Sequence, residues 1–219
     1  MTDPRTRARS AGGTGWRELD LATAVDLVAT RAAAGVAARG VADVVVPGGR
    51  GPTRLFAALR DRGLPGPAWR VHLADERCVP DDDPRRNAAA VAAALGVAPL
   101  GPPATPDPVA AAAAWTAALA PVGAFDVVVL GLGADGHVAS LFPGATAPLA
   151  PDAADAVPAG ASAPAPPRVT LSAVRLRRTR AVLLVVDGPD KDAAVARIRA
   201  GCDGDLPTSA LAGPPRWLV

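Results

Sequence analysis

Short apolar runs alternate along the chain with longer segments whose apolar positions recur at helical spacing. The short runs are rich in valine and leucine and predict strands at residues 42–46, 69–73, 125–130 and 181–186. The longer segments predict helices at residues 19–38, 53–62, 87–95, 108–119 and 191–199. Because strands and helices alternate, the pattern predicts the α/β class, as a single three-layer αβα domain with a mostly parallel, Rossmann-like sheet.

Two segments depart from this alternation. Residues 1–15 are polar and rich in arginine, and they predict a disordered leader before a domain that spans residues 16–219 without a linker. Residues 145–167 are rich in alanine and proline, and they predict a long loop with little structure of its own. We expect order to resume at residues 168–171, and a last strand at 216–219.

The stretch at residues 125–144, FDVVVLGLGADGHVASLFPG, carries the strongest chemical signal. A buried strand runs into glycines that allow a tight turn and close approach to a ligand. Asp135 and His137 follow at the carboxyl end of the strand, where open α/β sheets bind ligands. Residues 140–143 predict a short helical turn. The other histidine, His72, lies within a predicted strand and is expected to be a packed core residue.

Gly131, Gly133 and Gly136 also match the spacing G-x-G-x-x-G of dinucleotide-binding turns. That fingerprint needs a following helix, and an acidic residue at the end of the next strand about 20 residues further on. Here the chain passes from Pro143 into alanine- and proline-rich sequence, and no predicted strand precedes Asp152. The pattern therefore disfavours a dinucleotide site.

Three other strand ends carry groups that suit an anion. Gly48 and Gly49 lie in a glycine-rich turn before a predicted helix, where free N–H groups favour phosphate, although a plain tight turn fits the segment equally well. The charged residues 75–77 predict either a solvated loop or part of the functional sheet edge. Lys191 is the one lysine beside 22 arginines and starts a helix at the same edge; a surface lysine is the alternative. Together these ends predict a small, negatively charged ligand.

Composition narrows the partners and the compartment. The net charge of +2 and the scattered basic residues favour neither nucleic acid nor an anionic membrane. Cys78 and Cys202 have no paired spacing and are expected to be free thiols in a reducing compartment. No apolar run of membrane-spanning length is expected, and the leader lacks the apolar core of a secretory signal. These features predict a cytoplasmic protein.

Four blocks in this order resemble the 6-phosphogluconolactonases of the pentose phosphate pathway. They are PGGRGP at 47–52, ADERCVP at 74–80 with Asn87, GLGADGHVASLFPG at 131–144, and RVTLS followed by GPDK between 168 and 191. The related glucosamine-6-phosphate deaminases share the Asp-Gly-His sequence but continue with Phe-Asn-Glu. This chain continues with Ser-Leu-Phe-Pro, which is similar to the lactonases.

The resemblance implies hydrolysis of 6-phospho-D-glucono-1,5-lactone to 6-phospho-D-gluconate. No metal is expected, because a lactone is already an activated ester and the sequence has no cluster of metal ligands. We also expect no cofactor, and a monomer or small homo-oligomer. An imidazole titrates near neutrality, so His137 can accept a proton from the attacking water. Asp135 is the candidate that orients this imidazole or shapes the turn, and Asp75 is assigned an orienting role. Candidate ligands of the substrate phosphate are Gly48, Gly49, Arg50, Arg77, Lys191 and Arg168.

Two departures from the family pattern concern the phosphate site. The family loop has serine and threonine after its glycine pair, whereas this chain has Arg50 and Gly51. The family also has serine before the residue equivalent to Asn87, where this chain has Arg86. Both departures add positive charge near the expected phosphate.

Three alternatives to the lactonase remain at this point. A sugar-phosphate deaminase or isomerase would need an acid after the Asp-Gly-His sequence, and residues 140–143 supply none. A sugar-phosphate sensor would not need His137 and would usually carry a DNA-binding helix-turn-helix, for which the short leader has no room. A glycine-rich turn with a structural histidine is the third, and four motif blocks in the family's order argue against it.

Overall fold

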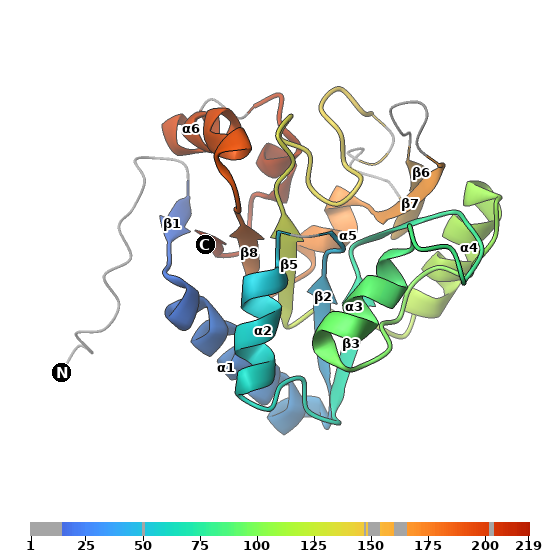
Figure 1. The fold of residues 1–219 in the computed structure, drawn as a ribbon, viewed down its shortest axis with the longest axis horizontal. Helices are drawn as coiled ribbons and strands as arrows, with labels where there is room; N and C mark the ends of the chain where they lie inside the picture. Colours follow the sequence, from blue (N-terminus) through green and yellow to red (C-terminus); the bar gives the residue numbers. More distant parts are fainter. Residues whose placement is uncertain (1–14, 50, 147, 149–153, 160–165, 202–203) are drawn as a thin grey trace.

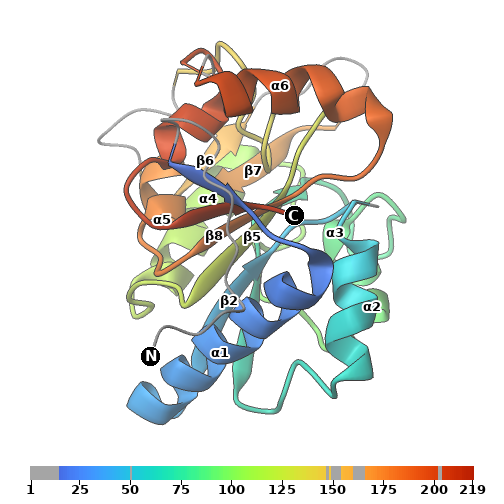
Figure 2. The same ribbon diagram turned by 90° about the vertical axis from the view of Figure 1, so that its left-hand side faces the viewer.

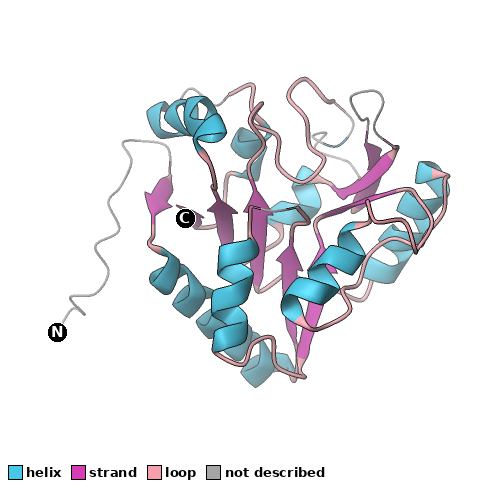
Figure 3. Cartoon of the chain, viewed as in Figure 1, coloured by secondary structure: helices cyan, strands magenta, loops and turns pink. Residues whose placement is uncertain are grey.

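The computed structural model describes residues 15–219, apart from 50, 147, 149–153, 160–165 and 202–203. The predicted leader thus lies outside the described residues except for Gly15. A six-stranded sheet forms the centre of the molecule, with helices on both of its faces (Figures 1 and 3). In spatial order its strands are β1 Trp16–Glu18, β9 Arg216–Leu218, β8 Val182–Val185, β5 Val127–Gly131, β2 Ala42–Val46 and β3 Trp69–Leu73.

All neighbouring strands of this sheet pair in parallel, which confirms the predicted fold class. Strands β2, β5 and β8 run upward in Figure 1, so their carboxyl ends meet at one edge. The predicted strands agree with β2 and β3 residue for residue, and with β5, β8 and β9 within two residues. Strand β1 was not predicted; its three residues are too few to show a period.

The first helix, α1 (Leu21–Arg39), covers the sheet near β2 (Figure 2). Asp20 caps its start by accepting a hydrogen bond from the Thr23 N–H at 2.7 Å, and Gly40 ends it with a φ of 76°. By length and composition α1 could cross a membrane, contrary to the expectation that no segment reaches that length. Its residues Ala24, Val25, Val28, Ala32 and Gly35 are buried in the core, as in the core helix of a folded domain.

The remaining long helices lie where the sequence predicts them, within two residues. They are α2 Thr53–Asp61, α3 Asn87–Leu95, α4 Pro108–Leu119 and α6 Asp192–Ala200. The short helix α5 (Ala173–Arg177) and the 3₁₀ turns η2 (Pro189–Lys191) and η3 (Pro207–Leu211) were not predicted. Trp115 of α4 is 2% exposed and anchors that helix in the core.

A second, antiparallel sheet stands beside the first. It consists of β4 Asp75–Arg77, β7 Arg168–Leu171 and β6 Ala156–Ala159, in that spatial order. Two expectations need correction here. The charged residues 75–77 form a strand with a buried start, which excludes a solvated loop. The segment 145–167 was expected to have little structure, but it contains β6, whose Pro158 is tolerated because β6 is an edge strand.

Two buried carboxylates, Asp43 and Asp126, lie near the amino ends of β2 and β5 and bind basic partners. Asp43 accepts hydrogen bonds from Arg70 at 2.7 and 2.8 Å and lies 2.8 Å from Nε2 of His72, so His72 is the packed core histidine that was expected. Asp126 accepts from the Asp43 N–H at 2.9 Å and from Arg39 at 2.6 Å. We call these five residues the basal ion cluster.

Candidate active site

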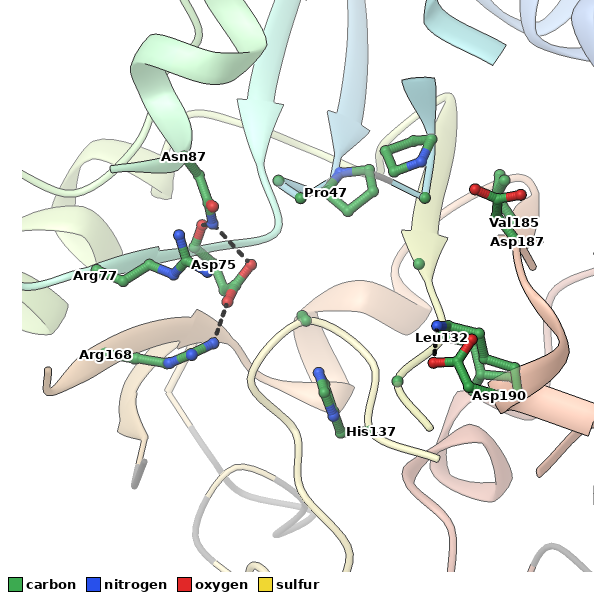
Figure 4. Close-up of a pocket in the computed structure, with 18 residues that line it drawn as sticks. Pro47, Asp75, Arg77, Asn87, Leu132, His137, Arg168, Val185, Asp187 and Asp190 are labelled. Carbon is green, nitrogen blue, oxygen red and sulfur yellow. Dashed lines mark hydrogen bonds and ion pairs between the residues drawn. The ribbon is translucent and has the colours of Figure 1, made fainter. Parts of the chain in front are cut away.

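A cleft of about 540 Å³ opens at the carboxyl ends of β2, β5 and β8. The small sheet forms its other wall through β4 and β7 (Figure 4). The polar groups and glycines that line it come from six separate parts of the chain: Gly48, Gly49, Gly51, Asp75, Arg77, Asn87, Gly131, Gly133, His137, Arg168, Asp187, Asp190 and Lys191. The fold therefore brings the predicted site residues to one place, with Asp135 directly behind His137. The predicted ligand Arg50 lies outside the described residues.

His137 is held by the turn that follows β5. Its Nδ1 lies 2.5 Å from Oδ1 of Asp135, and the same oxygen accepts from the His137 backbone N–H at 3.1 Å. Gly133 is required beside the ring, because a Cβ there would lie 2.1 Å from Nδ1 of His137. On its other side the ring packs against Phe142, with 4.9 Å between ring centroids.

The Asp135 carboxylate determines which nitrogen of His137 can act as a base. Burial acts to raise the pKa of Asp135, but the hydrogen bonds from His137 outweigh burial and lower it. An ionised carboxylate accepts only, so Nδ1 of His137 carries the donated proton. The lone pair of a neutral imidazole is then on Nε2.

The chain after His137 makes a tight turn rather than the predicted helical turn. Val138 and Leu141 exchange backbone hydrogen bonds of 3.3 and 2.9 Å, and Ala139 between them has a φ of 52°. The glycine-rich loop therefore lacks the helix on which a dinucleotide site depends. The turn buries Ser140, whose Oγ donates to Oδ2 of Asp75 at 2.5 Å.

Asp75 is held by three partners on the wall of the cleft (Figure 4). Besides Ser140, it accepts a hydrogen bond from Nδ2 of Asn87 at 3.3 Å, and Nη1 of Arg168 lies 3.8 Å from its Oδ2. Asn87 also donates to the Asp75 carbonyl at 2.9 Å. Asn87 belongs to a motif block of the sequence but was not predicted as a site residue. The sequence feature that could have identified Asn87 is its side-chain amide, which stands alone at the start of an alanine-rich helix.

Among the described residues, three cations line the cleft: Arg77, Arg168 and Lys191. Arg77 and Arg168 lie on the wall with Asp75, and the Nε atoms of both are buried without an acceptor among the described residues. Burial lowers the pKa of Arg168, yet a guanidinium stays charged. Lys191 lies across the cleft and forms an ion pair with Asp190. Buried N–H donors without acceptors suit an anionic ligand.

Fold and cleft together define a class of protein. It is an α/β protein that presents an oriented histidine among anion-binding groups at the carboxyl edge of a parallel sheet. Comparisons with known proteins specify the class further.

Residues 17–217 match the family model described as glucosamine-6-phosphate isomerases/6-phosphogluconolactonase, so the chain belongs to this family. A 6-phosphogluconolactonase of Mesorhizobium japonicum is 39% identical over 185 residues, which cover 77% of this chain and 78% of that protein. The Mycobacterium tuberculosis 6-phosphogluconolactonase is 36% identical, over 85% of each chain. The crystal structure of a 6-phosphogluconolactonase from Shewanella baltica superposes with a TM-score of 0.78, at 25% identity over 96% of this chain and 95% of that one.

Proposed function

We propose that this protein hydrolyses 6-phospho-D-glucono-1,5-lactone to 6-phospho-D-gluconate in the oxidative pentose phosphate pathway. The observation that carries the proposal is His137, oriented by Asp135 at 2.5 Å in a cleft lined by three cations. Relatives named 6-phosphogluconolactonase support the reaction class. The proposal also places the enzyme in the cytoplasm, which suits the free thiol of Cys78.

In the proposed mechanism, His137 acts as a general base through Nε2. It takes a proton from water while the water oxygen attacks the lactone carbonyl carbon. Asp135 holds the ring and stabilises the imidazolium that forms. The tetrahedral oxyanion is stabilised by cations or backbone N–H groups of the cleft. When the bond to the ring oxygen breaks, that oxygen receives the proton back from His137 and becomes the hydroxyl of the product.

The phosphate is assigned to the cations and to the glycine loop after β2. Gly48 and Gly49 line the cleft before α2, and Arg77 and Arg168 supply buried guanidinium donors. Lys191 adds a positive charge, and Arg50 remains a candidate from the loop sequence. Asp75 has both oxygens engaged, which supports an orienting role rather than proton transfer.

The other activity named in the family description is less well supported. A deaminase or isomerase reaction would need an additional acid near the reacting carbons, and residues 138–143 carry none. The polar residue of that turn, Ser140, is buried and bound to Asp75.

The test is hydrolysis of freshly generated 6-phosphogluconolactone by the wild type and by His137→Ala, with spontaneous hydrolysis subtracted. We expect the variant to lose at least about 100-fold in kcat/KM, because general base catalysis contributes 10²- to 10⁴-fold. Asp135→Asn is the matched variant, since it keeps the side-chain shape and loses the charge behind the ring, and its loss should be smaller. A folded wild type without turnover would reject the proposed function.

A further inference from the structure

Glu76 is a carboxylate with no exposed surface, and it lies between two residues of the cleft wall. Because neighbours in a strand point to opposite sides, Asp75 and Arg77 of β4 line the cleft while Glu76 points away from it. A buried carboxylate costs stability unless its oxygens are well bound. The partners of Glu76 therefore indicate what this residue supports.

All three hydrogen-bond partners of Glu76 are backbone N–H groups, two at the start of α3 and one in β4 itself. Oε1 of Glu76 accepts from the N–H groups of Asn87 and Arg77, both at 2.7 Å, and Oε2 accepts from Ala88 at 2.8 Å. Arg86, which precedes α3, makes no capping bond through its side chain, and its Nε lies 3.8 Å from Oε2. Glu76 thus caps α3 from a distant strand and fixes the first residue of that helix, Asn87.

Asn87 fills the space between two parts of the cleft. Its Nδ2 bonds the carbonyl and carboxylate of Asp75 at 2.9 and 3.3 Å. Its amide oxygen lies against Gly48 so closely that a Cβ on Gly48 would be 2.0 Å away. The position of Asn87 therefore sets the separation between the glycine loop and Asp75.

The connection continues from Asp75 to the histidine loop. Oδ2 of Asp75 accepts from Oγ of Ser140 at 2.5 Å, and Ser140 belongs to the tight turn directly after His137. A continuous series of hydrogen bonds thus runs from Glu76 through Asn87 and Asp75 to Ser140.

We propose that Glu76 is a positioning residue, which acts through Asn87 and Asp75 on the glycine loop and on the loop that carries His137. The role in catalysis rests on the proposed function, whereas the effect on the His137 loop does not. Glutamine is a sensitive replacement because all the backbone partners of Glu76 are donors. Its NH₂ group would face an N–H and leave at least one of these donors unbound.

The first experiment is a double-mutant cycle with Glu76→Gln and Asn87→Ala, read as kcat and KM for lactone hydrolysis. Each single change should lower kcat/KM about tenfold or more, and the double variant should lose little beyond either one, because the two act in series. Losses that multiply would overturn the path through Asn87.

The second experiment reads the loop without turnover. The chain has only two histidines, so the imidazole NMR signals of the untagged protein report His137 and His72 separately. Glu76→Gln should shift the signals of His137 and leave those of His72 in place. The matched variant is Asp126→Asn, which alters an equally buried carboxylate in the basal ion cluster and should shift only His72.

The outcomes separate the two claims. Unchanged His137 signals in Glu76→Gln would overturn the positioning role, as would a kcat/KM loss no larger than that of Asp126→Asn. A wild type without lactone hydrolysis would reject the proposed function, and the His137 signals would then decide the positioning role alone.

Discussion

Lys191 contributes a charge to the cleft at the end of a flexible stem, opposite the guanidinium groups of Arg77 and Arg168. Its side chain is 19% exposed and pairs with Asp190, a surface carboxylate that an anionic substrate can replace. We expect Lys191→Met to raise KM about 10- to 100-fold with a smaller change in kcat, because a hydrogen bond to a charged group contributes about 1.5–3 kcal/mol.

Initial rates over a range of lactone concentrations measure this effect. The control is Arg197→Met, which removes a cation from α6 outside the cleft and should leave KM unchanged. Equal KM values for Lys191→Met and the wild type would remove Lys191 from the substrate site.

At this scale, the sequence predicted the residues that line the cleft better than the residues that support them. His137, Asp75 and Lys191 follow strands, so the topology of a parallel sheet was enough to predict that they meet. Glu76 and Ser140 act through hydrogen bonds to residues 11 and 65 positions away in the sequence. No local pattern encodes such partners.

Helix α1 depends on a glycine for its packing. A Cβ on Gly35 would lie 2.4 Å from Oδ2 of Asp126, which is buried and bound to Arg39. A glycine-to-alanine change inside a helix ordinarily raises the free energy of unfolding by about 1 kcal/mol. Here we expect Gly35→Ala to lower the free energy of unfolding by about 1–3 kcal/mol, because overpacking outweighs helix propensity.

Urea unfolding measures this change, and a second background tests its cause. In Asp126→Ala the obstructing carboxylate is absent, so adding Gly35→Ala should be neutral or stabilising. A further loss in that background would show that the carboxylate is not what excludes a side chain at Gly35.

The sequence predicted helices and strands correctly where the hydrophobic period of a segment matches the face that it buries, as in α1 to α4 and the central strands. The second sheet was missed because its members are short and paired across long separations. β6 reads Ala-Val-Pro-Ala, which has weak strand propensity and is a strand because it pairs with β7. The turn after His137 was mistaken for a helix because its geometry depends on Ala139 at a positive φ, which alanine rarely adopts.

The cleft and the basal ion cluster lie at opposite ends of the parallel strands. Burial acts to raise the pKa of Asp43, but hydrogen bonds from His72 and Arg70 outweigh it and lower the pKa to about 2, from 3.8. A carboxylate with a lowered pKa stabilises the folded state above its unfolded pKa. The stabilisation is lost as the pH falls from about 4 through about 2, and it amounts to about 2 kcal/mol.

Urea midpoints between pH 5 and pH 2 test this expectation. The free energy of unfolding of the wild type should fall over this range more steeply than that of Asp43→Asn, because the variant has no carboxylate to protonate at position 43. The exposed Asp82→Asn serves as the control and should keep the wild-type slope. Parallel curves for the wild type and Asp43→Asn would contradict the assignment.

The pairing of β1 with β9 has a consequence for how the chain assembles. Trp16 lies opposite Arg216, so β1 leaves the ribosome 200 residues before its sheet neighbour. At synthesis rates of 5–20 residues per second, β1 waits for its sheet neighbour for roughly 10 s or more. Since β9 lies between β8 and β1, this nascent sheet cannot close before its last strand is made. A chain that ended in α6 would leave β1 without its sheet neighbour and one edge of β8 open.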